Sequence, residues 1–439
     1  MVRVAAWQIL RSGSTTPMRL VDREASRSGL DDRDRGLLRQ IIGTELRRRG
    51  TLRAIVKAFT RRPPKPDLAA HYHIGLVQLL FLDRIPHHAA VSTTVDAARR
   101  TLGGAKTTNV NGFLRAVIRA RVEGHSGDPR QDFTWRDQHF DVPVFRDYED
   151  QPLLWAEDAL SMPASLLKRW AKRHGREKAF ALARTFSVEP PLSVRMVRGE
   201  RDAVVAELEA AGCESFPGEH EAILICPGEQ TGTVISSAAF QEGRITIQGE
   251  SALRGAELLG ATAGERVLDL CAAPGGKSSV FAVSGAEVTA LDRDPRRLAR
   301  VEDTRSRLDL SNLKLVASDS TSALAEDASF DAVFIDAPCS NTGTLGAHPG
   351  ARWRFGPKSM KELVGIQTEL IRDGAKHVRP GGRMVWSTCS LEPEENGQLV
   401  KRFLEEHPEW AEGESHEFLP DLERGPTDGG FAALLTRKG

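Results

Sequence analysis

The sequence predicts three parts: an all-α bundle, then a small α+β module, and finally an α/β core in which helices cover both faces of a mostly parallel sheet. At 439 residues the chain is too long for one compact core. Apolar residues recur at helical spacing in the first part, whereas after residue 250 short apolar segments alternate with helical ones. We therefore predict the bundle over residues 1–125, a linker over 126–152, the module over 153–249 and the core over 250–439.

The composition is that of an ordinary globular protein, with 40% hydrophobic and 27% charged residues. No apolar run approaches the roughly 18 residues of a membrane span, and the first residues lack a secretory signal pattern. These features predict a cytoplasmic protein that has no membrane partner.

The bundle is predicted from four amphipathic segments. The first opens at Asp31 and Asp32, which are suitable helix caps, and the second stops at Pro86. Ser, Thr and Asn cap candidates open the third and fourth. The four helices are expected over residues 30–60, 69–85, 87–102 and 107–121.

The charge is unevenly distributed, although the net charge is zero. Residues 1–125 hold 23 Lys and Arg against 10 Asp and Glu, which leaves 37 against 50 in the rest. Such an excess fits a module that touches a polyanion, and it equally fits an Arg-rich solvated surface. Charge alone leaves both interpretations open.

Residues 126–152 are polar, rich in Asp, Gly and Pro, and show no periodicity, which predicts a linker. The module after it is predicted to open with helices and to continue with a helix over ERDAVVAELEAAG. Its strands are expected at PPLSVRMVRG, AILIC, TGTVIS and RITIQ.

The core is predicted from apolar strands with helices between most of them. In such sheets ligands bind beyond the carboxyl ends of the strands, so the loops that follow these strands are the candidate site. The expected strands are RVLDL (266–270), EVTALD (287–292), LKLVA (313–317), DAVFID (331–336), RMVWSTC (383–389) and FAALLT (431–436).

The loop CAAPGGK after the first of these strands contains small residues, which let a ligand approach the backbone, and it leads into a helix N-terminus. Acidic residues stand at the ends of the next three strands. Any one of them alone fits a cap or turn, but three in register favour a nucleoside ligand without phosphates, such as S-adenosylmethionine. The candidate cofactor residues are Cys271, Ala272, Ala273, Pro274, Gly275, Gly276, Lys277, Asp292, Asp319 and Asp336.

The chain has five cysteines, whose scattered spacing predicts neither a disulfide framework nor a metal site. Cys213 and Cys226 fit buried structural positions. Cys339 and Cys389 instead stand at strand ends that face the predicted ligand. A thiolate that adds to C6 of a pyrimidine makes C5 nucleophilic enough to accept a methyl group, so one thiol is a candidate nucleophile and the other assists proton transfer or release.

Three segments, DLCAAPGGKSS, FIDAPCSNTGTL and GGRMVWSTCSLEPEENGQLV, resemble the NOL1/NOP2/Sun family of RNA 5-methylcytosine methyltransferases, in its bacterial RsmB (Sun) type. Upstream, HIGLVQLLFLDRIPHHAAV and NGFLRAVIRAR resemble the NusB-like RNA-binding domain of the bacterial members, and DGGFAALLTRKG resembles the family's last strand. The resemblance implies a Rossmann-like methyltransferase core, S-adenosylmethionine as cofactor and a 16S rRNA cytosine as target, with no obligate protein partner evident.

The resemblance also implies roles for the site residues. Cys389, in Thr-Cys-Ser, is then the attacking thiol, and Cys339, in Pro-Cys-Ser, is the product-release thiol. Asp336 serves the cofactor and the cytosine amino group or ring nitrogen. Two positions depart from the family, because Gly350 and Gly249 stand where Asp is usual.

Two alternatives belong to other classes. Methyl transfer to an exocyclic amine is suggested distantly by DAPC, but direct attack by an amine needs no thiol. A non-catalytic NusB-like RNA-binding factor is suggested by the first part alone, and it leaves the cofactor loop and the paired thiols unexplained.

Overall fold

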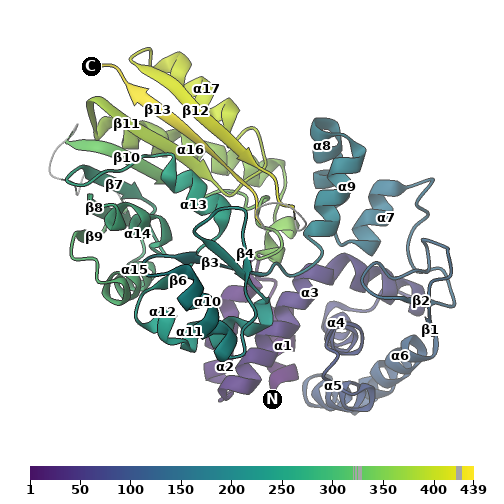
Figure 1. Ribbon diagram of the computed structural model, residues 1–439. Coiled ribbons are helices and arrows are strands. Elements are labelled where there is room, and N and C mark those ends of the chain that lie inside the picture. The colour runs from purple at the N-terminus through teal and green to yellow at the C-terminus, as the bar shows by residue number, and fades with distance from the viewer. Residues whose placement is uncertain (320, 322–323, 325–328, 422–427) are drawn as a thin grey trace. The chain divides into compact units, whose positions relative to one another are not determined.

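The computed structural model describes residues 1–319, 321, 324, 329–421 and 428–439. It divides into two compact units, of which the first comprises Met1–Val188 with His348–Arg354 and the second Glu189–Ala347 with Phe355–Gly439. The predicted fold class is confirmed: helices build the N-terminal part, and a mostly parallel sheet builds the core (Figure 1). The predicted domain boundaries remain a prediction.

The first unit is built on helices, and those from α1 to α6 bury one apolar cluster. The long helix α3 begins where predicted, because the Asp31 side chain accepts a hydrogen bond from the Asp34 backbone N–H at 2.7 Å. The helices are α1 (Val2–Arg11), η1 (Pro17–Leu20), α2 (Val21–Arg27), α3 (Asp32–Phe59), α4 (Pro66–Phe81), α5 (His87–Leu102), η2 (Gly104–Lys106), α6 (Thr107–Arg119), α7 (Pro152–Ala159), α8 (Ala164–His174) and α9 (Arg176–Thr185).

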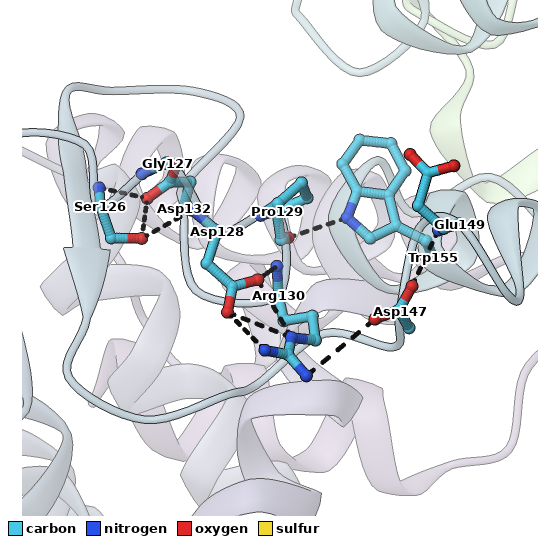
Figure 2. A network of polar contacts seen from close by, with 9 residues as sticks. All are labelled: Ser126, Gly127, Asp128, Pro129, Arg130, Asp132, Asp147, Glu149 and Trp155. Carbon is cyan, nitrogen blue, oxygen red and sulfur yellow. Dashed lines mark hydrogen bonds and ion pairs between the residues drawn. The ribbon is translucent and has the colours of Figure 1, made fainter.

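The segment predicted as a linker, residues 126–152, packs onto this unit. β1 (Arg121–Glu123) pairs with β2 (Gln138–Phe140), and Phe133 and Phe140 are buried in the helical core. Polar side chains order its turns: Asp132 accepts from the backbone and hydroxyl of Ser126, and Trp155 donates to the Pro129 carbonyl at 2.9 Å (Figure 2). The Asp and Gly residues that resemble a linker in composition thus satisfy backbone donors in tight turns.

A short helix, η5 (Pro349–Trp353), also belongs to the first unit. The buried Arg352 donates to the carbonyls of Ser161 and Phe186, and the Trp353 indole donates to the Leu46 carbonyl at 2.7 Å. A Cβ added at Gly350 would lie 3.4 Å from a methyl group of Leu46. Gly350, which stands where Asp is usual in the family that the sequence resembles, therefore lies in a segment that packs on α3.

The second unit opens with a four-stranded antiparallel sheet in the order β4-β5-β3-β6. Three of the predicted strands are present, but the expected strand TGTVIS is wrong, because it forms helix α11 and buries Val234. Packing of that turn overrides the preference of Thr, Val and Ile for strands. The elements are β3 (Leu192–Met196), α10 (Arg201–Ala210), β4 (Phe216–Pro217), β5 (Ile223–Cys226), η3 (Gly228–Gln230), α11 (Thr231–Ser236), α12 (Ala238–Gln241) and β6 (Ile245–Ile247).

The large sheet has the order β12-β13-β11-β10-β7-β8-β9. The five strands from β11 to β9 are parallel, whereas β13 runs antiparallel to both β11 and β12. All the predicted core strands are present, and β12 was not predicted. The strands are β7 (Arg266–Leu270), β8 (Glu287–Asp292), β9 (Leu313–Ala317), β10 (Phe330–Asp336), β11 (Val378–Thr388), β12 (Trp410–Phe418) and β13 (Gly430–Arg437).

Helices cover the two faces of this sheet and bury a separate apolar cluster on each (Figure 1). One face carries α13 (Glu250–Glu257), α14 (Gly276–Val283) and α15 (Pro295–Leu308), and the other α16 (Pro357–Lys376) and α17 (Gly397–Glu406). After β7 the chain builds outward through β8 and β9 and then returns to β10 on the other side of β7. The carboxyl ends of β7 and β10 thus flank the topological switch point, where ligands bind in such sheets.

Within the described ranges, none of the helices combines the length and apolar character of a membrane span.

Candidate active site

Three strand ends meet at one edge of the large sheet. β10 lies between β7 and β11, and all three run parallel. The loop Cys271–Lys277 leaves β7, Asp336 ends β10 and pairs with Ser387, and Cys389 directly follows β11. The fold therefore gathers the glycine-rich loop, one predicted carboxylate and both predicted thiols.

The two cysteines lie in direct contact. Cys339 Sγ and Cys389 Sγ are 3.0 Å apart, and both residues are half-buried free thiols. The hydrogen bond with Cys389, and then burial, raise the pKa of Cys339 well above its ordinary value. Cys339 is therefore held as a neutral thiol beside Cys389.

A buried carboxylate joins the two cysteine loops. Each cysteine is followed by a serine, and the hydroxyls of Ser340 and Ser390 both donate to Glu395. The carboxylate also accepts from the Ser340 backbone N–H and from the Gln367 amide, each at 2.9 Å. Glu395 was not predicted as a site residue, although it explains why both motifs read Cys-Ser.

An ion pair stands next to the thiols. Lys277, at the start of α14, places its Nζ 2.6 Å from the Asp336 carboxylate. Burial opposes the charged form of Lys277, but Asp336 and the nearby Cys389 together raise the pKa of the lysine above its ordinary value. The charged form of Lys277 is thus favoured close enough to Cys389 for the two to interact electrostatically.

The glycine-rich loop turns sharply before α14. Gly275 has φ +99°, and a Cβ there would lie 2.9 Å from Val301, so both the conformation and the space require glycine. Cys271, with φ +64°, is the other residue of this loop in the left-handed region, and burial raises the pKa of its thiol to about 12. Cys271 thus remains a neutral thiol within the loop.

The two remaining predicted carboxylates differ in their surroundings. Asp292, at the end of β8, is buried, accepts from the Ala273 N–H at 3.3 Å and pairs with Arg297 at 3.2 Å. Arg297 also donates to the Ala273 carbonyl at 2.8 Å, so it ties the loop to α15. Asp319, two residues past β9, is exposed.

Sequence reasoning missed two polar residues near this loop. Neither atom of the buried Gln248 amide has a hydrogen-bond partner among the described residues, and a Cβ at Gly276 would lie 3.7 Å from it. Asp428 likewise has a buried oxygen without such a partner. A Cβ at Gly249 would lie 2.4 Å from the other oxygen of Asp428. The Asp428 carboxylate therefore occupies the space that a side chain at position 249 would need.

These features fit an adenosyl ligand that carries a cationic sulfur. Asp292 and Asp336 stand at strand ends, Gly276 leaves the backbone open, and the unsatisfied Gln248 and Asp428 can take ligand hydrogen bonds. Asp269, the penultimate residue of β7, is buried too: burial raises its pKa to about 7, and the Ser278 hydroxyl donates to it. This hydrogen bond ties the end of β7 to the first turn of α14.

Comparison with known proteins gives the family. Residues 256–422 match the family described as 16S rRNA methyltransferase RsmB/F, and residues 2–119 match the NusB family. The chain is 31% identical to the ribosomal RNA small subunit methyltransferase B of Proteus mirabilis over 417 residues, which cover 93% of this chain and 92% of that protein. The chain belongs to the ribosomal RNA small subunit methyltransferase B family.

Members of this family use S-adenosylmethionine as cofactor, so the predicted cofactor and methyltransferase class are confirmed. The probable ribosomal RNA small subunit methyltransferase B of Bacillus subtilis is 30% identical over 404 residues, which cover 90% of this chain and 83% of that protein. Among solved structures, PH0851 matches 99% of this chain and 98% of its own at a TM-score of 0.74 and 23% identity, which supports the fold. The roles of individual site residues remain predictions.

Proposed function

We propose that this protein methylates C5 of a cytosine in 16S rRNA, with Cys389 as the nucleophile and Cys339 as the residue that completes release. The observation that carries this proposal is the 3.0 Å contact between two thiols at adjoining strand ends, next to Lys277 and Asp336. Transfer of a methyl group to an amine needs no thiol, whereas transfer to the weakly nucleophilic C5 carbon does.

The first step is addition of the Cys389 thiolate to C6, which places the electron pair on C5. The cofactor, when bound, supplies an electrophilic methyl group on a cationic sulfur. Lys277 stabilises the thiolate through its charge, and Asp336 accepts from the cytosine amino group, or from N3 once that nitrogen is protonated during the addition. The C5 electron pair takes the methyl group, and the ring then carries both the new methyl group and the original C5 proton.

Release requires a base and then elimination. Cys389 keeps the pKa of Cys339 high through their hydrogen bond and its charge, and both effects end once the Cys389 sulfur is bonded to C6. Cys339 can then ionise and take the C5 proton. The C6–sulfur bond breaks, the aromatic ring is restored and Cys389 leaves as a thiolate, so the cycle loses one proton overall.

The NusB-like part is proposed to hold the RNA. The match to the NusB family over residues 2–119 and the excess of Lys and Arg in residues 1–125 support this. Arg61 and Arg62 are adjacent and exposed between α3 and α4. If they contact phosphates, changing both to Gln lowers the salt slope of rRNA binding by about 2. Lys401→Gln on the exposed side of α17 is the matched control.

The deciding experiment follows the hydrogen on C5. Transcribed 16S rRNA that carries tritium at C5 of cytosine is incubated with the protein and S-adenosylmethionine, and tritium released to water is compared with methyl groups incorporated. The proposal expects equal amounts. Methylation without tritium release would show that an exocyclic amine is the acceptor, and absence of both would favour a non-catalytic RNA-binding factor.

A further inference from the structure

One residue outside the predicted site donates hydrogen bonds to both cysteines. Asn341, in the loop two residues past Cys339, has its side-chain Nδ2 3.2 Å from Cys389 Sγ. Its backbone N–H is directed at the sulfur of Cys339. Asn341 therefore lies across the thiol pair and offers a separate donor to each sulfur.

The loop holds Asn341 in this position. Its φ is +60°, in the left-handed region that Asn tolerates better than most residues with a side chain. Its carbonyl accepts from the Thr344 backbone N–H at 3.1 Å and from the Thr344 hydroxyl at 3.4 Å. A fixed backbone and a short side chain leave the amide few other orientations, so the donor is aimed before substrate binds.

An N–H donor favours a thiolate over a thiol. A charged sulfur accepts a stronger hydrogen bond than a neutral one, so a fixed amide donor lowers the cost of ionisation. The amide itself does not titrate, which distinguishes it from the charged groups around it. The thiolate is the reactive form of cysteine, so the size of its population sets the rate of attack.

We propose that Asn341 is a positioning residue that stabilises the Cys389 thiolate through its side-chain amide and fixes the direction of its sulfur. The inference rests on the proposed role of Cys389 as the nucleophile. It adds a residue whose side-chain donor serves Cys389, while its backbone N–H serves Cys339.

Other charged and titratable groups also act on Cys389 and stay constant between variants. Cys339 faces it from the loop after β10 and Lys277 from α14, where Lys277 pairs with Asp336 at the end of β10. Glu395 acts on the thiol pair from the segment after β11, and Asp428 interacts with Lys277 from the segment before β13. Changes at Asn341 leave all of them in place.

The test is the pH profile of Cys389 alkylation by iodoacetamide in the full-length protein, without RNA or cofactor, with each cysteine followed separately by peptide mass spectrometry. Asn341→Gly removes the amide and keeps the left-handed backbone relaxed, so it is the primary variant. We expect alkylation of Cys389 at pH 7 to be about tenfold slower in this variant than in the unchanged protein. Asn341→Asp, which keeps the shape but replaces the donor with a charge, is expected to slow it further.

Asn341→Ala controls for strain, because Ala adopts a positive φ less readily than Asn or Gly. A shift in the Ala variant but not in the Gly variant would assign the effect to the backbone and overturn the proposal, as would identical profiles for all variants. Thermal unfolding identifies any variant that fails to fold. If the Asn341 variants react like the unchanged protein, the proposal for Asn341 fails, but the tritium-release result that supports the proposed function still stands. Tritium release that persists in Cys389→Ala would instead refute the proposed function itself.

Discussion

Glu395 is expected to hold the two thiols together, and removing its carboxylate tests how the site is built. The residue is fully buried and accepts four hydrogen bonds, from the Ser340 backbone, the Ser340 and Ser390 hydroxyls and the Gln367 amide. Glu395→Ala removes the acceptor that these four donors share, while the Gln367 amide keeps the Pro338 carbonyl and both serine hydroxyls keep the Thr342 hydroxyl as a neighbour. At about 1 kcal/mol for each lost hydrogen bond, the free energy of unfolding should fall by up to about 4 kcal/mol.

Glu395→Gln separates shape from charge. The amide keeps the volume and one carbonyl oxygen, and the serine hydroxyls can rotate to accept from its NH₂ group. We expect it to lose only the extra strength of charge-assisted bonds, about 1–2 kcal/mol, and to retain the fold. Its methyltransferase activity should nevertheless fall more than its stability does, because small displacements between Cys339 and Cys389 disturb the reacting geometry.

The measurement is urea unfolding of the full-length protein followed by circular dichroism, arranged as a double-mutant cycle with Ser340→Ala. A direct bond between Ser340 and the carboxylate predicts a coupling free energy of about 1.5–3 kcal/mol. Thr368→Ala on α16 serves as a matched control, because its hydroxyl donates within its own helix, to the Val364 carbonyl. Additive effects of Glu395 and Ser340 would refute the idea that one carboxylate links the two loops.

Three further outcomes are expected. Cys389→Ala should abolish methylation and covalent capture of RNA, whereas Cys339→Ala should accumulate a protein–RNA adduct that survives a denaturing gel; the absence of an adduct would contradict the release role. Gly249→Asp should cost about 1–3 kcal/mol of stability in thermal unfolding, because its Cβ would lie 2.4 Å from the Asp428 carboxylate, and Asp428→Gly should restore most of it. Burial raises the pKa of Asp269 to about 7, so the folded state binds a proton that the unfolded state has lost above about pH 4. Its stabilising contribution is thus present below about pH 4 and is lost as the pH rises to 7, so the free energy of unfolding should fall over this range. Asp269→Asn should remove this fall from a plot of unfolding free energy against pH.

The sequence predicts those elements in which buried apolar residues recur in a pattern that can be seen along the chain. β7, β8, β10 and the buried half of β11 are mostly apolar because helices cover both faces of the sheet there. β12 gives no such signal, since nearly all of its side chains are exposed and backbone pairing with β13 forms it. The helix α11 was mistaken for a strand because its Thr, Val and Ile residues prefer strands, and only tertiary packing makes them helical.

The same physical difference separates the site residues that the sequence predicts from those that it does not. Cys339 and Cys389 were predictable because each ends an apolar run, and strand ends in a parallel sheet share one edge. The residues that aim them were not, because their roles depend on contacts across about fifty positions: Asn341 reaches Cys389, and Glu395 reaches back to Ser340. In the letters LEPEEN nothing distinguishes the glutamate that accepts four hydrogen bonds from its neighbours. The repeated Cys-Ser dipeptide is one signal that the sequence does carry. Two serines that must reach one carboxylate have to follow their cysteines at the same spacing. This pairing can be searched for wherever two thiols are expected to meet.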